Sequence, residues 1–598
     1  MFFRRKSVGE RCYLQIVESR RDGSSVRQHI VATLGRAEDW LGTGKLDQLL
    51  QSGARLSETT LVLSALRDGD GLTVDSRRLG PPLIFERLWR ETGCQAVVEG
   101  LLAERQFRFP VERAIFASVL HRLCISGSDR ACDKWLEGYR VAGLDGIDLH
   151  HLYRAIAWLG EELADQEGRT RAPRAIKDLV EERLFARRRD LFNDLDLVFF
   201  DTSALYFHGA GGETLGRRGK SKDHRPELKQ VVIGVVIDRH GRPLCSETWP
   251  GNATDVQALL PVIDRLRARF CIGRICVVAD RGMISARTLA ELEERGIEYI
   301  LGTRERNDAE VRETVLAEAT GMVPLSIPKA AGTTTDIEVK EVLVRPHDGK
   351  RGDGKGKPRR YVVCYNPERA AWEAAQRTAI IAALQEQLSR GDKSLVGNNG
   401  FRKFLKVEGC DHFALDEAKV AEEAKLDGFY VLRTNSKLPT LEVAMRYREL
   451  WKVEQIFRTT KAVLETRPVD HASDAAIRGH LFCSFLALVL RKELQDRLQA
   501  AERDLEWQDV IADLDRVVET TVEQQGRRFV LRNQTPGCAG AVFQAVGVAL
   551  PPLFRRLDAE KPAAPTGPPT PKPRKRRLTP RTRSATPAAK NRIHKSDQ

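Results

Sequence analysis

Runs of alternating and of continuous apolar residues divide the chain into stretches that predict strands and helices. Residues 12–19 and 26–34 are rich in β-forming positions, and Asp22-Gly23 between them is typical of a tight turn, so we expect a β-hairpin. Residues 82–190 instead have apolar positions at helical spacing, as in VERAIFASVLHRLC. The chain therefore begins with a short β region and continues with a mainly helical one.

Between residues 195 and 303 the pattern changes to short apolar runs that alternate with helical segments. The predicted order is strand, strand, strand, helix, strand, helix, strand, at residues 195–201, 229–238, 244–249, 255–270, 274–280, 285–296 and 297–303. The first three strands are expected to form an antiparallel meander, with GRP as the turn before the third. With one more helix this order is the ribonuclease-H-like layout, in which helices cover a mixed sheet.

A long insertion separates this order from the helix that would complete it. Within the insertion, DIEVKEVLVRP and RRYVVCY predict a second hairpin, PERAAWEAAQRTAIIAALQEQL predicts a helix, and residues 427–435 predict a strand. The completing helix is YRELWKVEQIFRTTK at residues 447–461. Residues 479–494 follow it, and because they are apolar nearly all round they predict a core helix.

We therefore predict an α/β chain whose ribonuclease-H-like core is interrupted by an insertion and preceded by a mainly helical region. The expected regions are 1–190, a hairpin plus helices; 191–305, the first part of the core; 306–440, an α+β insertion domain; 441–500, the completing helix and the rest of the core; 501–557, a C-terminal helical region; and 558–598, a disordered basic tail.

Composition narrows the class of protein. The formal net charge is +14, but the segment from Lys561 onward has eleven Lys and Arg against one acid, so the tail contributes +10 and residues 1–560 only +4. Such a tail, with PKPRKRRLTPRTR, either adds salt-sensitive affinity for nucleic acid or is simply solubilising.

The chain has eleven cysteines and no C-x-x-C pair, so we expect reduced thiols and no zinc site. With no apolar run of 18 residues and no secretory signal, we expect a cytoplasmic protein that does not enter a membrane.

Three acids stand out because of where they lie. Asp201 and Asp280 end the first and fourth predicted strands, and Glu454 lies in the apolar stripe of the completing helix. A carboxylate on a buried face is costly unless a positive group meets it. In the ribonuclease-H-like layout the first and fourth strands are neighbours and the helix packs across their ends, so we expect the three carboxylates to converge.

Convergent carboxylates are stable only if cations neutralise them, and oxygen ligands favour Mg²⁺ or Mn²⁺. Two such ions about 3.5–4 Å apart would clamp an in-line attack on a phosphodiester. Each acid alone also fits an ordinary role. Asp201 and Asp280 could be turn formers or caps, and Glu454 could lie on a solvated helix surface. The three together, in this strand order, favour the metal site.

The helix also matches a known signature, Tyr-x2-Arg-x3-Glu-x6-Lys. Tyr447, Glu454 and Lys461 have the required spacing, whereas Leu450 stands at the Arg position. Other similar stretches are MFFRRKSVGERCYLQIVESRR, FFDTSALYF, SKDHRPELKQVVIGVV, PGNATD, VVADRGMIS, DGFYVLRTN and IRGHLFCSFLALVL. Over most of residues 1–495 the sequence resembles a DDE transposase of a bacterial insertion sequence, of the insertion-sequence-four superfamily.

The resemblance implies cut-and-paste transposition in the bacterial cytoplasm, at the nucleoid. Asp201, Asp280 and Glu454 would be the catalytic metal ligands, with two Mg²⁺ or Mn²⁺ ions. The partners would be double-stranded DNA (terminal inverted repeats and target) and a second copy of the chain in a homodimer. The N-terminal 190 residues would bind the transposon ends.

The resemblance also indicates DNA contacts. By that analogy Tyr447 and Lys461 would hold phosphates near the cleaved end, Arg458 would supply charge nearby, and Trp451 would stack on a base or fill the core. The loop SKDHRPELKQ is a separate candidate. It either follows a phosphate backbone or is a solvated loop, and its candidate residues are Lys222, His224, Arg225 and Lys229. In related transposases a hairpin forms on the transposon end and the signature residues hold the DNA there, and Leu450 at the Arg position is a departure from that pattern.

Two alternatives remain at this point. The chain could be a catalytically inactive DNA-binding relic, which Leu450 favours and the intact set of acids disfavours. It could also be a ribonuclease-H-like DNA nuclease that cleaves but does not join, although the long insertion is more typical of a transposase.

Overall fold

The computed structural model describes most of the chain in two compact units. The described residues are 2–9, 11–22, 25–46, 48–49, 73–103, 105–125, 127–164, 172–188, 197–209, 211–221, 225–270, 275–283, 285–303, 308–317, 321–328, 334–345, 358–390, 403–408, 412–462, 469–524 and 527–557. One unit comprises residues 1–73, 522–530 and 555–598, and the other comprises 74–521 and 531–554. The predicted tail, 558–598, lies outside the described residues.

The first unit contains a three-stranded antiparallel sheet in the order β1 (Phe2–Val8), β2 (Arg11–Asp22), β3 (Ser25–Arg36), followed by the short helix α1 (Ala37–Trp40). The predicted hairpin is confirmed as β2 and β3, whose register closes at Asp22 and Ser25. The strand β1, with FFRRKSV, was not predicted, because alternation of apolar residues is weak in so basic a segment.

Helices α3 to α8 form the first part of the second unit, as the helical spacing predicted. They are α3 (Gly80–Glu91), α4 (Cys94–Leu102), α5 (Val111–Cys124), α6 (Asp129–Leu136), α7 (Leu149–Leu159) and α8 (Ile176–Arg187). Ser128 caps α6 by accepting a hydrogen bond from the backbone N–H of Ala131, and Asp148 forms a capping box with His151 at the start of α7.

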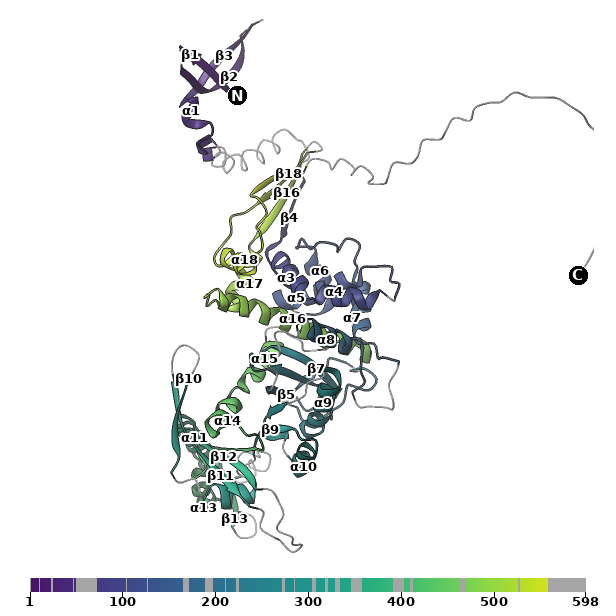
Figure 1. Cartoon of the computed structure of the whole chain (residues 1–598), viewed down its shortest axis with the longest axis vertical. Coiled ribbons are helices and arrows are strands. Elements are labelled where there is room, and N and C mark those ends of the chain that lie inside the picture. Colours follow the sequence, from purple (N-terminus) through teal and green to yellow (C-terminus); the bar gives the residue numbers. More distant parts are fainter. Residues whose placement is uncertain are drawn as a thin grey trace, which may run out of the picture. The chain divides into compact units, whose positions relative to one another are not determined.

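The core helix predicted at 479–494 is confirmed as the middle of α16 (Asp474–Ala500), which Ser473 caps. α3, α5 and α7 pack on α16, and β7 (Pro243–Pro250) packs on it as well, so this helix joins the helical part to the sheet (Figure 1). Gly160 and Gly479 allow α7 and α16 to approach closely. A Cβ on either would collide with a backbone carbonyl of the other segment, Ala475 or Ile156.

The main sheet of the second unit has the strand order β10-β11-β12-β15-β9-β8-β5-β6-β7 within the described residues. Its strands are β5 (Leu197–Tyr206), β6 (Gln230–Asp238), β7, β8 (Cys276–Ala279), β9 (Glu298–Gly302), β10 (Val323–Pro328), β11 (Thr334–Val344), β12 (Arg359–Tyr365) and β15 (Phe429–Thr434). β5, β6 and β7 form the predicted antiparallel meander, while β5, β8 and β9 are parallel. Helices α9 (Asp255–Phe270) and α10 (Ala286–Glu294) stand between the strands in the predicted order.

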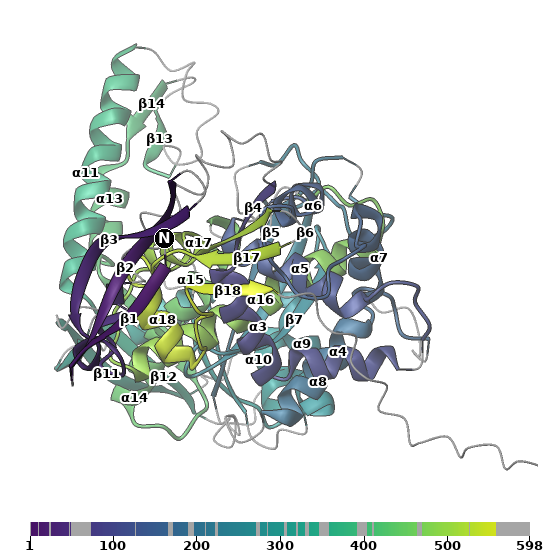
Figure 2. The same cartoon turned by 90° about the horizontal axis from the view of Figure 1, so that it is seen from above.

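The insertion extends this sheet. β15 pairs with β9, and β12, β11 and β10 continue outward from β15, with the predicted hairpin confirmed as β11 and β12. The remaining elements, α11 (Pro367–Arg390), β13 (Leu405–Glu408), β14 (His412–Leu415) and α13 (Glu417–Ala424), lie together beside it (Figure 2). Their separate apolar cluster centres on Leu384 and Phe404.

The region 501–557 differs from the expected helical region. It contains α17 (Trp507–Asp515) and α18 (Ala539–Val546), but also β16 (Val518–Gln524), β17 (Arg527–Arg532) and β18 (Phe554–Leu557), in a sheet with β4 (Thr73–Arg78). These strands are short and carry many polar residues, as in VETTVEQ, so their apolar signal is weak. None of the helices in the described part of the chain is both long and apolar enough to cross a lipid bilayer.

Candidate active site

Two of the three acids lie on neighbouring parallel strands. In the pairing of β5 with β8, Phe199 stands opposite Val278. Counting two residues further along each strand brings Asp201 level with Asp280, and adjacent strands are about 4.8 Å apart. The expected adjacency of the first and fourth strands is therefore confirmed.

Asp201 lies within its strand, and the prediction that it ends the strand is wrong. β5 continues to Tyr206 because β6 pairs with it from Val198 onward, whereas the pairing with β8 stops at Phe199. The side chain of Asp201 is half-buried, and its Oδ1 accepts a hydrogen bond from the backbone N–H of Thr202 at 2.7 Å. This bond restricts the rotation of the carboxylate.

Asp280 follows β8 directly and is exposed. Its carbonyl accepts a hydrogen bond from the N–H of Met283, which closes the single turn Arg281–Met283. The hydroxyl of Tyr447 donates to Asp280 Oδ1 at 3.1 Å. Gly302, the last residue of β9, makes room for this contact, because a Cβ there would collide with the Tyr447 hydroxyl.

The segment predicted as one helix at 447–461 is two helices. α14 (Thr440–Arg448) carries Tyr447, and α15 (Trp451–Ala462) carries Glu454. Between them the N–H groups of Leu450 and Val453 donate to the carbonyls three residues earlier, those of Tyr447 and Leu450. This tighter turn shifts the phase of the second helix, so positions counted along a single ideal helix are displaced.

The expectation that Glu454 lies on the buried face is wrong, and of the two alternatives for Trp451 the core position is not the one observed. Leu450, Val453 and Phe457 form the buried stripe of this segment, whereas Glu454 is exposed and Trp451 is 50% exposed. Because α15 packs against β5, the helix bearing Glu454 adjoins the strand bearing Asp201. Glu454 therefore needs no buried cation, and its carboxylate is accessible for a ligand from solvent.

The three acids do not form a tight cluster. Within the described residues, two other sets of three groups have all their ligand atoms within 4.8 Å of one another, and Asp201, Asp280 and Glu454 are not such a set. One ion bound by all three does not fit this spacing.

The other predicted DNA contacts are only partly described. Arg458 is exposed on α15, and Lys461 is in α15 but its side chain lies outside the description. Arg225 is exposed, pairs with Glu227 at 2.7 Å and lies 5.9 Å from the ring centre of Tyr206. Lys229 is half-buried just before β6, and Lys222 and His224 lie outside the described residues.

A neighbour of Tyr447 was not identified from the sequence. The ring of Tyr430 on β15 stacks on that of Tyr447 with centroids 6.2 Å apart, and burial raises the pKa of Tyr430. Tyr430 stands in the predicted strand DGFYVLRTN, where an aromatic residue is an ordinary core position. Only the pairing of β15 with β9 brings it to the site.

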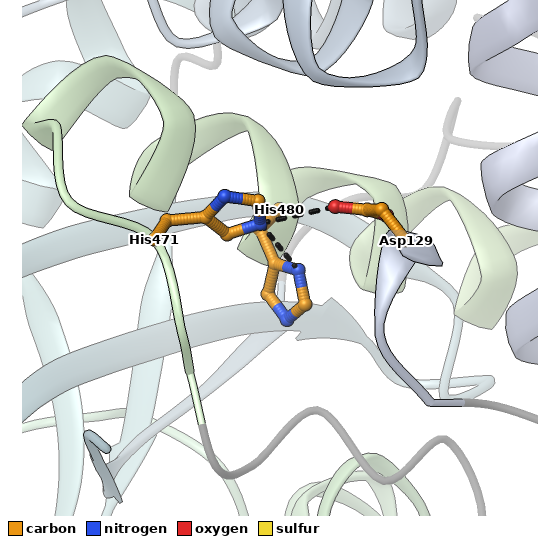
Figure 3. Close-up of side chains that lie close together, drawn as sticks. All are labelled: Asp129, His471 and His480. Atoms are coloured by element: carbon orange, nitrogen blue, oxygen red, sulfur yellow. Dashed lines mark hydrogen bonds and ion pairs between the residues drawn. The ribbon is translucent and has the colours of Figure 1, made fainter. Parts of the chain in front are cut away.

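One set of possible metal ligands lies on α6, on α16 and in the segment just before α16. Figure 3 shows Asp129, His471 and His480 close together. His471 Nε2 lies 3.1 Å from Asp129 Oδ2 and 3.2 Å from His480 Nδ1. The buried guanidinium of Arg122 donates to His480 Nδ1 at 2.8 Å and lies 3.5 Å from Asp129 Oδ1.

This buried cluster is best explained as an ion pair. Nδ1 of a histidine has one lone pair, and Arg122 already occupies that of His480. A metal ion at the same place would also lie against a buried positive charge, which is unfavourable. Asp129 therefore neutralises Arg122 and holds α6 to α16. The other set of ligand atoms, Asp148, His150 and His151, belongs to the exposed cap of α7.

Two family models match the chain. Residues 193–490, which contain all three acids, match the family described as "Transposase DDE domain", and residues 3–64 match "IS1634 family transposase, N-terminal domain". The chain belongs to the DDE transposases of insertion sequences. The transposase is therefore a metal-dependent enzyme that cleaves DNA and transfers strands, and the family resemblance seen in the sequence is confirmed.

The transposase is similar to the piggyBac transposase in a synaptic complex with hairpin DNA, with 11% identity, a TM-score of 0.32, and coverage of 73% of this chain and 79% of that chain. A likeness at this TM-score carries no argument about the fold. No curated protein matches the transposase in sequence.

Proposed function

We propose that the transposase moves an insertion sequence by cut-and-paste transposition, with Asp201, Asp280 and Glu454 as the ligands of two divalent ions, Mg²⁺ or Mn²⁺. The central strands of the sheet have the order β7-β6-β5-β8-β9, and β6 runs antiparallel to the other four. This arrangement supports a ribonuclease-H-like core. The observation that carries the proposal is the register that brings Asp201 level with Asp280. The contact of Tyr447, a signature residue, with Asp280 joins the signature to the acids.

Each acid has a distinct task in this proposal. Bound divalent ions would lower the pKa of an attacking water or 3′-hydroxyl and stabilise the leaving oxygen. Asp201, held by the N–H of Thr202, offers a carboxylate in a defined orientation. The hydroxyl of Tyr447 donates to Oδ1 of Asp280, so that Oδ2 would serve as the ligand atom. Glu454, exposed on α15, closes the site from the helix side.

The partners follow from the reaction. The substrates are the terminal inverted repeats and target DNA, held by Tyr447, Trp451, Arg458 and Lys461 and by the 222–229 loop. The N-terminal region through residue 190 recognises the ends, and two copies of the transposase act on paired ends. Its DNA substrate puts it in the bacterial cytoplasm, at the nucleoid.

The test is cleavage of duplex DNA that carries the inverted repeats flanking the gene. Wild type cleaves with Mg²⁺ or Mn²⁺ and not with EDTA. Asp201→Asn, Asp280→Asn and Glu454→Gln lose cleavage but bind the same DNA with unchanged affinity. Glu294→Gln, at an exposed acid at the end of α10, is the matched control and cleaves normally. Normal cleavage by Glu454→Gln would contradict the third ligand.

A strand-transfer assay with a pre-cut end separates the alternatives. A transposase joins this end to a target plasmid, a nuclease cleaves without joining, and a relic binds without doing either. The relic is favoured by one feature, the Leu450 side chain at the Arg position, which is 5% exposed and packs in the core.

A further inference from the structure

A basic cavity lies beside α15, on the side away from Glu454. It has a volume of about 680 Å³ and is lined by α15, α16, the turn between β6 and β7, and residues 502–505. Four basic side chains line it (Lys452, Arg491, Lys492 and Arg503) against two acidic ones, Glu502 and Asp504. The lining has two more basic than acidic side chains, although two of the basic ones are paired with carboxylates outside it.

Arg491 differs from the two lysines of this cavity. The Nζ of Lys452 bonds Glu449 Oε1 at 3.1 Å, and that of Lys492 bonds Asp496 Oδ1 at 2.7 Å, so both charges are compensated. Arg491 has no carboxylate partner among the described residues, and its buried Nη1 makes no hydrogen bond there. Burial lowers the pKa of Arg491 to about 10, with no acid opposing the shift.

A partly buried guanidinium without a counter-ion is costly, and such groups in native proteins have a reason. The ring of Trp507, 4.3 Å below the guanidinium carbon, offers a cation–π contact but accepts no hydrogen bond from it. The five N–H donors of an arginine match the geometry of a phosphate. An anion that enters the cavity would satisfy the charge and the donors together.

The cavity and the acid share one helix. Trp451, Lys452, Gln455, Ile456 and Thr459 line the cavity from α15. At 100° per residue, Glu454 points roughly 130° away from the centre of this face. A helix is about 10 Å across, which equals the axial rise of roughly three base pairs of duplex DNA at 3.4 Å each. A duplex whose axis runs across α15 from the acids would therefore bring to the cavity a phosphate about three nucleotides from the cleaved one.

We propose that this cavity binds a backbone phosphate of the DNA strand held at the acids, with Arg491 as its principal ligand. The assignment of the phosphate to DNA rests on the proposed function. The phosphate chemistry rests on the cavity alone, and the same chemistry would hold a free phosphate ion.

The first test measures affinity for end DNA, its salt dependence and the thermal midpoint. Arg491→Met binds about tenfold more weakly than wild type. The slope of log K against log salt becomes shallower by about 0.9, as for one lost phosphate contact. The midpoint is unchanged or higher, because a buried charge without a counter-ion has gone. The matched control is Arg287→Met on α10, where the side chain is 88% exposed, and it keeps both affinity and slope.

The second test locates the contact on the DNA. A neutral methylphosphonate placed two to four nucleotides from the cleaved phosphate weakens binding by wild type and has no further effect on Arg491→Met. Equal additional losses in both proteins would overturn the contact. A fall in midpoint that accounts for the loss of affinity would overturn it too, since it would show a purely structural role.

Inorganic phosphate distinguishes the source of the ligand. If it raises the midpoint of wild type and not of Arg491→Met, while both bind DNA equally, the cavity holds a free anion and the DNA assignment is wrong. If wild type shows no metal-dependent cleavage but the Arg491 effects on DNA affinity persist, the proposed function fails and the phosphate site stands.

Discussion

At the scale of single residues, the contact between Tyr447 and Asp280 links the signature of the family to the acids. It depends on Gly302, which no sequence motif singles out, because only a residue without a Cβ leaves space for the tyrosine hydroxyl. In the same segment the side chain of Glu454 is exposed, whereas that of Leu450 is buried. The apolar side chain anchors the segment, and the carboxylate is left for a ligand.

We predict that Tyr447→Phe slows metal-dependent cleavage at saturating DNA by about tenfold, because a hydrogen bond to a charged group is lost while the ring stack on Tyr430 remains. Single-turnover cleavage under saturating DNA measures this. Tyr153→Phe, at a 41% exposed tyrosine of α7, is the control and cleaves at the wild-type rate. A rate for Tyr447→Phe equal to that of this control would show that the hydrogen bond has no role.

At the scale of elements, α16 is the shared core of the helical part and the sheet, and its end is strained. Glu502 has φ 54°, the positive value that glycine prefers, and no other non-glycine residue in the described part of the chain has a positive φ. The N–H groups of Glu502 and Arg503 bond the carbonyls of Gln499 and Leu498, which is the Schellman arrangement with a glutamate where glycine is usual. Glu502 also lines the basic cavity, so strain and a candidate binding site coincide.

We predict that Glu502→Gly stabilises the chain by about 1 kcal/mol, because glycine adopts this backbone conformation without a Cβ clash. The midpoint of urea unfolding measures the change. Glu502→Ala is the matched control, since it removes the same side chain but keeps the Cβ, and it brings no such gain. If both variants have the same midpoint, the backbone at residue 502 is not strained.

At the scale of the whole molecule, the junction of α5, α6 and α16 contributes to the dependence of stability on pH. Burial, and to a smaller extent the nearby charge of Arg122, lowers the pKa of His121 from 6.5 to about 4. The folded chain therefore keeps this imidazole neutral. Burial alone would raise the pKa of Asp129, but the hydrogen bond from His471 and the charge of Arg122 hold it well below 3.8. In both cases the unfolded chain binds a proton more readily than the folded one.

We predict that folding stability falls as the pH drops below about 6.5, by about 1.4 kcal/mol per pH unit from His121 alone until its folded pKa near 4 is reached. The contribution of Asp129 is complete above about pH 4 and is lost below it. Thermal midpoints of wild type and His121→Phe between pH 7.5 and 5 measure the first effect, because their difference excludes the other histidines. Parallel pH profiles for the two proteins would contradict it.

Much of the fold follows from local patterns. The run of strands and helices from 195 to 303, the β11–β12 hairpin, α11 and α16 were all predicted, because each has enough apolar residues at a regular spacing. The strands of 501–557 were not, because polar residues mask their alternation. The break between α14 and α15 was missed as well. No proline or glycine marks it, and the burial of Leu450 and Val453 beside the break is a feature of the folded chain only.

The sequence by itself determined the family, the identity of the three acids as candidates and the order of the core elements, because these depend on spacing along the chain. Tertiary structure decided which groups meet. Pairing of β5 with β8 brings Asp201 level with Asp280, and pairing of β15 with β9 brings Tyr430 to Tyr447. Packing of α15 beside α16 surrounds Arg491 with a cavity and no counter-ion. Such contacts join residues hundreds of positions apart, and burial, register and charge compensation exist only once the chain has folded.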